Sequence, residues 1–430
     1  MTNKTRSAII CLLVIILKFK QNKILILCWA TYLSAYICRI NMSTALLQLE
    51  SAFEIGGGVL GVLGSLFFVT YAIGQLINGF VGDRVSPYVM LVIAMAGTVT
   101  LNLTIGISGN ITVIMICWTA NGYFQSMIWG PLMRVLSSAY TKERNANITM
   151  VMSTSMVLGY IFSWVVFASL FSDMKWNLLF LVPAAISISP LIIWGVLLRR
   201  RQNEQSSKKE TPNLRNTIQI IKKAHLAAVI GVCVCSGLIR ESISLWAPVM
   251  MIKTLGFEPK HLFILLFLIP IFNFSGILFA RWLMSRAHTF KNPIGSMLLI
   301  FFTGILICGA GFLFLSSISG LSGLFFMSCI SGLCFGANSI LLSLIPLSYA
   351  KHNIVSTLVG VFDFCSYIGA AISAYGLGII LEGASWKFIP LIWICFACAA
   401  ITLSLVYRFK TKRKVANKNE QEIAQQPANY

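Results

Sequence analysis

The sequence has little charge and few of the residues that carry catalysis. Only 11% of its 430 residues are charged and 57% are hydrophobic, whereas about a quarter of a soluble globular domain is charged. It has only 4 histidines and no Gly-Lys dipeptide, H-E-x-x-H or G-x-S-x-G motif. These absences exclude a P-loop for ATP-driven pumping, a zinc protease helix and a serine hydrolase elbow. We therefore expect no enzyme activity.

Cysteines are present, but their spacing does not match a pattern of disulfide pairs or metal ligands. The 12 cysteines are scattered through apolar segments. Cys395 and Cys398 form a C-x-x-C inside an apolar run, with no histidine nearby in the sequence. We interpret the cysteines as small packing residues, and we predict neither a metal site nor a cofactor.

Long hydrophobic runs recur along the whole chain. Runs of about 18 or more mostly apolar residues match the hydrocarbon core of a bilayer, which is about 30 Å thick. The sequence therefore predicts an all-α polytopic membrane protein with twelve transmembrane helices in two pseudo-symmetric six-helix halves, an architecture of secondary transporters. The expected spans are 24–47, 59–80, 88–108, 111–133, 146–170, 176–198, 226–251, 262–284, 293–317, 320–346, 354–380 and 388–408.

The expected spans divide the chain into five parts. The predicted domains are a cytoplasmic N-terminal lead-in, the first six-helix half, a basic cytoplasmic linker, the second six-helix half and a cytoplasmic tail. Their boundaries are 1–23, 24–198, 199–225, 226–408 and 409–430. The short apolar run of the lead-in fits an interfacial segment, and initiation after residue 18 is the alternative.

Acidic residues are scarce, and the basic residues are unevenly placed. The chain has 13 aspartates and glutamates against 33 lysines and arginines. Most of the basic residues lie at the two ends, in the linker and in loops of the same face, whereas the opposite face has Lys175, Lys253, Lys260 and Lys387. Positive residues favour the cytoplasmic side, so both termini and the linker are predicted there. The surplus fits anionic lipid headgroups, and we predict no nucleic-acid partner.

Two arginines lie inside predicted spans. Arg39 lies well within the apolar run 24–47, and Arg240 has the matching place in the second half. An arginine near the centre of a membrane helix costs about 2.5–3.5 kcal/mol on insertion scales, so such a residue is functional by default. Arginine stays charged and presents a planar fork of donors that suits phosphate or carboxylate. The pair predicts an anion site at the midplane between the halves.

Other polar side chains inside the spans are candidates for the same site. Glu241 and Asp363 are candidates for coupling, because a buried carboxylate can carry a proton. Since Glu241 follows Arg240 on a helix, it is expected to point about 100° away and to pair with another element or to titrate alone. The candidates for shaping the substrate site are Tyr36, Gln125, Trp129, Asn338 and Tyr367.

A short polar turn follows the second predicted span. Gly79 allows close helix packing, and Asp83 and Arg84 can pair with neighbouring charges or helix ends. Arg134, at the predicted cytoplasmic end of the fourth span, is the expected partner of Asp83. We interpret these residues as a gating motif whose contact holds one conformation shut.

Several motifs carry a family resemblance. Together they resemble the major facilitator superfamily and, within it, the organophosphate:phosphate antiporters, which include glycerol-phosphate and hexose-phosphate transporters. The motifs are Tyr36-x-x-Arg39-x-Asn41, Gly79-x-x-x-Asp83-Arg84-x-x-Pro87, Asn121-x-x-x-Gln125-x-x-x-Trp129-Gly130-Pro131-x-x-Arg134, Lys142-Glu143-Arg144, Arg240-x-x-x-x-x-Trp246-x-Pro248 and Gly360-x-x-Asp363-x-x-x-Tyr367-x-Gly369.

The resemblance implies a function. It implies that Arg39 and Arg240 hold the phosphoryl group of a small organic anion, which is exchanged for inorganic phosphate by alternating access. It also implies a multi-pass protein of the plasma membrane, expected to be a bacterial cytoplasmic membrane, that works as a monomer. A proton-coupled symporter of a carboxylate or phosphonate and a transporter-like sugar-phosphate sensor remain alternatives.

The chain departs from the family where other charges are usual. Family members often have lysines at the positions of Ile40 and Gln75, and acidic residues near Leu245 and Pro270. The site is thus thinned of charge, and the resemblance does not select glycerol 3-phosphate or hexose 6-phosphate as the substrate.

Overall fold

The chain folds into long helices. The computed structural model describes residues 3–82, 85–140, 145–167, 170, 175–200, 226–258, 265–290, 292–316, 318–349, 355–383 and 388–424. The longer helices are α1 (Asn3–Phe53), α2 (Gly57–Gly82), α3 (Pro87–Ile107), α4 (Ile111–Ser126), α5 (Trp129–Ala139), α6 (Asn145–Ile161), α8 (Leu178–Arg200), α10 (Leu226–Lys253), α12 (Leu268–Ser285), α13 (Pro293–Leu315), α14 (Gly320–Ser339), α16 (Val355–Gly383) and α17 (Ile389–Ala424). The shorter ones are η2 (Phe162–Phe167), η3 (Ala287–Thr289), η4 (Ile340–Leu344) and α15 (Ile345–Ser348).

The predicted fold class is confirmed, and one predicted span is interrupted. Within the described ranges, eleven helices are long and apolar enough to cross a bilayer. The predicted span 111–133 is divided into α4 and α5 by a turn at Met127 and Ile128, whose N–H groups bond three residues back, at 3.1 and 3.2 Å. Pro131 lies in the first turn of α5 and lacks the N–H that a continuous helix would use there, so one helical hydrogen bond is missing at the interruption.

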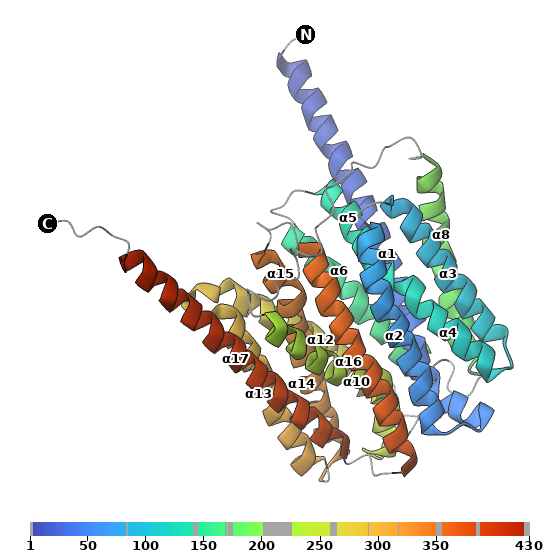
Figure 1. The fold of residues 1–430 in the computed structure, drawn as a ribbon. Coiled ribbons are helices and arrows are strands. Elements are labelled where there is room, and N and C mark those ends of the chain that lie inside the picture. The colour runs from blue at the N-terminus through green and yellow to red at the C-terminus, as the bar shows by residue number, and fades with distance from the viewer. Residues whose placement is uncertain are drawn as a thin grey trace.

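The two halves lie side by side, and both ends of the chain lie on one side of the molecule (Figure 1). Helices α1–α8 form the first half and α10–α17 the second. Between the halves, α2 packs along α16, α1 along α10, and α6 along α12. At the α2–α16 contact a Cβ on Gly61 would lie 2.8 Å from the Ala374 carbonyl oxygen and 2.9 Å from the Gly378 Cα. Small residues therefore let these two helices approach closely.

The halves touch on both sides of the bundle's middle. Away from the chain ends, Lys253 of α10 donates to both carboxylate oxygens of Glu50 in α1, at 2.7 and 2.9 Å. Nearer the middle, the Ser43 hydroxyl donates to the Leu245 carbonyl at 2.7 Å. Toward the chain ends, α6 meets α12, where Arg281 lies 3.1 Å from the sulfur of Met150.

The predicted lead-in continues into the first span without a break. α1 is one helix from Asn3 to Phe53, of which Asn22–Phe53 is the part long and apolar enough to cross a membrane. Most of the predicted linker, residues 201–225, lies outside the described residues. The domain boundaries therefore stay predictions.

Candidate functional site

Arg39 lies in the middle of α1 and faces the second half. Its side chain is buried, and its Nη2 donates to the hydroxyl of Tyr367 in α16 at 2.9 Å. The guanidinium is surrounded by aromatic rings from three helices. Its central carbon lies 4.7 Å from the ring centre of Tyr71, 5.1 Å from Tyr367, 5.5 Å from Phe67 and 5.7 Å from Tyr36. Each desolvated cation–π contact stabilises a cation by roughly 0.5–2 kcal/mol, so the rings hold and orient the charge.

Arg240 lies in α10 and is buried as deeply. Its Nε donates to its neighbour Glu241 at 2.9 Å, and its Nη2 lies 3.5 Å from the hydroxyl of Ser366. Its guanidinium carbon is 5.6 Å from the ring of Tyr367 and 5.8 Å from that of Phe335. Tyr367 therefore contacts both arginines, and the two charges face one shared space between the halves.

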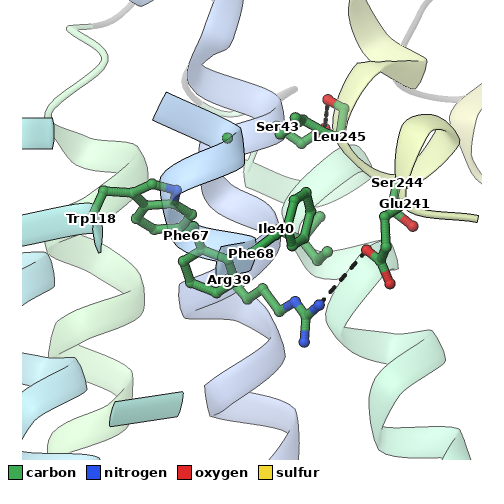
Figure 2. Close-up of a pocket in the computed structure, with 10 residues that line it drawn as sticks. Arg39, Ile40, Ser43, Phe67, Phe68, Trp118, Glu241, Ser244 and Leu245 are labelled. Atoms are coloured by element: carbon green, nitrogen blue, oxygen red, sulfur yellow. Dashed lines mark hydrogen bonds and ion pairs between the residues drawn. The ribbon is translucent and has the colours of Figure 1, made fainter. Parts of the chain in front are cut away.

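Glu241 joins the two arginines. Its Oε1 accepts from Arg240, and its Oε2 lies 3.7 Å from Nη2 of Arg39. Figure 2 shows this carboxylate pointing from α10 toward Arg39. Pairing with another element was predicted, whereas the contact with the neighbouring Arg240 was not, because the long side chains bend back across the 100° step of the helix. One carboxylate thus contacts a guanidinium from each half.

A pocket lies beside this cluster, and Figure 2 shows the residues that line it. Its cavity volume is about 20 Å³, which is room for about one water molecule. Its lining residues come from α1, α2, α4 and α10: Arg39, Ile40, Ser43, Gly64, Phe67, Phe68, Trp118, Glu241, Ser244 and Leu245. The indole N–H of Trp118 is buried and makes no hydrogen bond to the described part of the chain. The pocket therefore combines apolar walls with a free donor and the arginine–glutamate cluster at one end.

Of the remaining predicted binding residues, some contact Arg39 and others lie away from the arginines and the pocket. Tyr36 and Tyr367 touch Arg39, as described above. Gln125 instead donates to the Cys38 carbonyl at 3.1 Å and so fixes the backbone of α1. The Trp129 ring lies 4.7 Å from that of Tyr32 and outside the set that lines the pocket. Asn338 is half-buried at the end of α14 and is not among the lining residues either.

The second coupling candidate lies on the other side of the cluster. Asp363 is half-buried in α16, one helical turn before Tyr367. It is close enough to Arg39, Arg240 and Glu241 to interact with them electrostatically. The structure therefore gathers both predicted carboxylates around the two arginines.

The predicted gating motif is described only in part. Asp83 and Arg84 lie outside the described residues, so their contact with Arg134 stays a prediction. Arg134 donates to the Val85 carbonyl at 3.0 Å, which places it beside the residue that follows Arg84 in the chain. Gly79 is exposed, and an added Cβ there would meet no atom of the described chain within 4 Å.

Sequence reasoning missed several residues of the site. Ser366 bonds Arg240 and adjoins the predicted Tyr367, so a search of the neighbouring positions would have found it. Tyr71 lies one helical turn before Gln75, which the motif comparison had already singled out, so it is also at a helix-neighbour position of a considered residue. Phe67 and Phe335 are aromatic residues in apolar helices, and no sequence signal separates them from ordinary packing residues.

Comparisons with known proteins identify the family. The family model described as the Major Facilitator Superfamily matches residues 28–374. The chain belongs to the Major Facilitator Superfamily. Solved structures of other transporters share this major facilitator fold. A mutant of the nucleoside transporter NupG has a TM-score of 0.69 at 12% identity, over 90% of this chain and 98% of that one. A mutant of the peptide transporter POT in complex with alafosfalin has a TM-score of 0.67 at 13% identity, over 90% and 94%.

Two of the relatives described next are named as transporters of phosphorylated compounds, and a third is named a membrane sensor. The chain is similar to a "Probable hexose phosphate transport protein" of Chlamydia trachomatis, at 24% identity over 90% of both chains. It is 22% identical to the "Membrane sensor protein UhpC" of Salmonella typhimurium over 90% of this chain and 91% of that one. It is also 22% identical to the "Glycerol-3-phosphate transporter" of Bacillus subtilis, over 87% and 90%. The predicted resemblance to the organophosphate:phosphate antiporters is confirmed, and the chain is a multi-pass membrane protein.

Proposed function

We propose that this major facilitator protein is a secondary active transporter of a small phosphorylated organic anion, exchanged for inorganic phosphate by alternating access of its halves. One observation carries the proposal. Arg39 from the first half and Arg240 from the second lie close enough together to contact a single carboxylate, that of Glu241. A phosphoryl group has the same charge sign and more oxygen acceptors, so it suits this position between the two guanidinium groups.

The energetics favour an anion that joins the halves. A hydrogen bond to a charged group contributes about 1.5–3 kcal/mol, and a guanidinium fork can make two of them to one phosphoryl group. The two arginines belong to different halves, so this energy is available only when the halves close around the anion. That gives the loaded carrier a differential affinity for the closed state, which any ligand-driven change of conformation requires.

The test is counterflow of radiolabelled phosphate in proteoliposomes. We compare the wild type with Arg39→Lys and Arg240→Lys, because lysine keeps the charge and loses the planar fork. Loss of one charge-assisted hydrogen bond, about 1.5–3 kcal/mol, raises the half-saturating phosphate concentration by about 10- to 100-fold. Arg408→Lys is the matched control, since the Arg408 side chain is exposed on α17, away from the two arginines of the site.

The outcomes separate the parts of the proposal. Exchange that is unaffected by either site substitution removes the arginines from the phosphate site. Wild-type protein that exchanges no phosphate shows that phosphate is the wrong substrate. A panel of organophosphates then identifies the organic anion if exchange is present.

Two observations favour other candidate functions. Glu241 and Asp363 lie beside the arginines, as a proton-coupled symporter of a carboxylate or phosphonate requires, and uptake driven by an imposed pH gradient tests this. The relative UhpC is named a membrane sensor protein. A sensor would bind sugar phosphate without counterflow, so binding in the absence of transport distinguishes it.

A further inference from the structure

We propose that Glu241 is a built-in counter-anion that lets the unloaded carrier change conformation, so that exchange is not obligatory and the protein also carries out net transport. This inference rests on the proposed function and concerns the same site. It assigns to Glu241 a positioning role: the carboxylate occupies the place between the arginines when no substrate is there.

The contacts of Glu241 cross the boundary between the halves. The residue belongs to α10 of the second half, and its Oε2 reaches Arg39 of the first half at 3.7 Å while Oε1 is held by Arg240 at 2.9 Å. Its side chain is buried, with a relative exposure of 5%. With this carboxylate between the arginines, the halves touch on both sides of the cluster. A protein carboxylate therefore makes the contacts through which a bound anion would hold the halves together.

The charge balance supports this role. Two buried guanidinium groups that face each other repel, and a site with that repulsion resists closing when it is empty. Glu241 offsets one of the positive charges by direct contact. Asp363 in α16, one helical turn before the Tyr367 that contacts both arginines, is the second carboxylate of this region. The four groups have no net formal charge, so closing the empty site leaves no uncompensated charge in the membrane interior.

Glu241 is also placed so that a substrate can displace it. Its contact with Arg39 is an ion pair at 3.7 Å, which is beyond hydrogen-bond length. An arriving phosphoryl group can make shorter, two-pronged bonds with the same guanidinium. Glu241 also lines the pocket, together with Ser244, so its carboxylate borders a cavity rather than packed side chains on that side. Substrate and Glu241 thus compete for Arg39, and either of them permits closure.

A carrier that lacks such a carboxylate behaves differently. When only the cargo neutralises the arginines, the empty carrier cannot reorient, and every outward step requires a returning anion. With a tethered carboxylate the empty carrier returns on its own. Net efflux into a medium without any substrate anion distinguishes the two cases.

The experiment uses proteoliposomes loaded with radiolabelled phosphate. Dilution into medium that contains phosphate measures exchange. Dilution into medium without phosphate measures net efflux. Potassium and valinomycin clamp the membrane potential in both. For the wild type we expect net efflux within about tenfold of exchange. For Glu241→Gln we expect the ratio of net efflux to exchange to fall by at least about tenfold, and the half-saturating phosphate concentration for exchange to fall several-fold, because the competitor for Arg39 is neutral.

Controls keep the outcome interpretable. Glu54→Gln makes the same chemical change at an exposed turn after α1 and is expected to keep the wild-type ratio. Glu241→Ala is assayed with and without formate on both sides of the membrane. Restoration of net efflux by formate supports the counter-anion, since a free carboxylate then fills the vacated place and a folding defect is not repaired in this way.

Each result decides a separate claim. Wild-type exchange without measurable net efflux overturns the inference and leaves the proposed function standing. Absence of both fluxes from the wild type overturns the proposed function. If Glu241→Gln has the same ratio of net efflux to exchange as the wild type, the inference is also overturned. If Glu241→Gln does not fold, the inference is still decided by the ratio of net efflux to exchange in the wild type and by the response of Glu241→Ala to formate. A loss of net efflux in Glu241→Ala that formate does not restore counts against the counter-anion.

Discussion

The close crossing of α10 and α16 beside the arginines gives a sharp prediction for Gly369. A Cβ at Gly369 would meet the Val234 carbonyl oxygen and would lie 3.0 Å from the Val234 carbonyl carbon and 3.1 Å from the Leu238 nitrogen. These are backbone atoms, which cannot rotate away. Gly376 lies on the same helix, and a Cβ there meets no atom of the described chain within 4 Å. Gly369→Ala and Gly376→Ala are therefore the same chemical change in crowded and in open surroundings.

The expected magnitude follows from two opposing effects. Replacing glycine by alanine inside a helix stabilises it by about 0.8–1 kcal/mol in water, and this gain is common to both variants. Overpacking against a fixed backbone costs about 1–3 kcal/mol and applies to Gly369→Ala alone. The free energies of unfolding of the two variants should thus differ by about 1–3 kcal/mol, with Gly369→Ala the less stable. The displaced helix also carries Ser366 and Tyr367, so weaker contacts with Arg240 and Arg39 should raise the half-saturating phosphate concentration.

The assay is reversible unfolding in mixed micelles of dodecyl sulfate, followed by tryptophan fluorescence, together with phosphate counterflow. Gly376→Ala should be at least as stable as the wild type, and its counterflow should match it. Equal stability of Gly369→Ala and Gly376→Ala would show that the helices separate at negligible cost. The reasoning from backbone contact would then be refuted, and with it the claim that this crossing fixes the position of Ser366 and Tyr367.

Two further predictions concern contacts between the halves. Tyr367→Phe keeps the ring against both arginines and removes the hydroxyl that Arg39 bonds at 2.9 Å. Loss of a hydrogen bond to a charged group, about 1.5–3 kcal/mol, should raise the half-saturating phosphate concentration by about tenfold or more in counterflow; an unchanged value would show that this bond does not support the site. Lys253→Gln removes the partly exposed ion pair with Glu50 and should shift the balance between open and closed forms of that face by no more than about fivefold, because exposed pairs contribute about 0–1 kcal/mol. Distances between spin labels at the ends of α1 and α10 measure this shift, and a larger change would indicate a gate that depends on this pair.

Most of the fold followed from the sequence because hydrophobic length is a direct requirement of the bilayer. The exception was the fourth span, which the sequence presents as one long and mostly apolar run. Pro131 divides it into α4 and α5, yet a proline also occurs inside continuous helices of this chain, at Pro183 in α8 and Pro248 in α10. Neighbouring helices decide which prolines interrupt a membrane helix, and that information is not local.

The sequence predicted which charged residues lie together in the candidate site, but only some of the residues that surround them. Arg39, Arg240 and Tyr367 stand out because charge and hydroxyl groups are costly in an apolar span, and the structure brings them together. The bridging position of Glu241 depends on the distance between α1 and α10, which the sequence does not contain. Gln125 and Trp129 also carry hydrogen-bonding groups and belong to one motif, yet Gln125 binds the α1 backbone and Trp129 packs on Tyr32.

The four aromatic rings around Arg39 stabilise its charge as water molecules would, but they are held in fixed positions. Water molecules would stabilise a guanidinium equally well, but they would have to reorganise whenever an anion arrives or leaves. The rings of Tyr36, Phe67, Tyr71 and Tyr367 surround the guanidinium, and ring faces carry partial negative charge but no net charge. They therefore stabilise the cation in the apolar interior without adding a charge of their own, and Glu241 is the carboxylate in contact with Arg39 that an arriving anion displaces. Further carboxylates in place of the rings would give the site a net negative charge and repel an anion, so the aromatic walls preserve the capacity of this helix to bind its cargo.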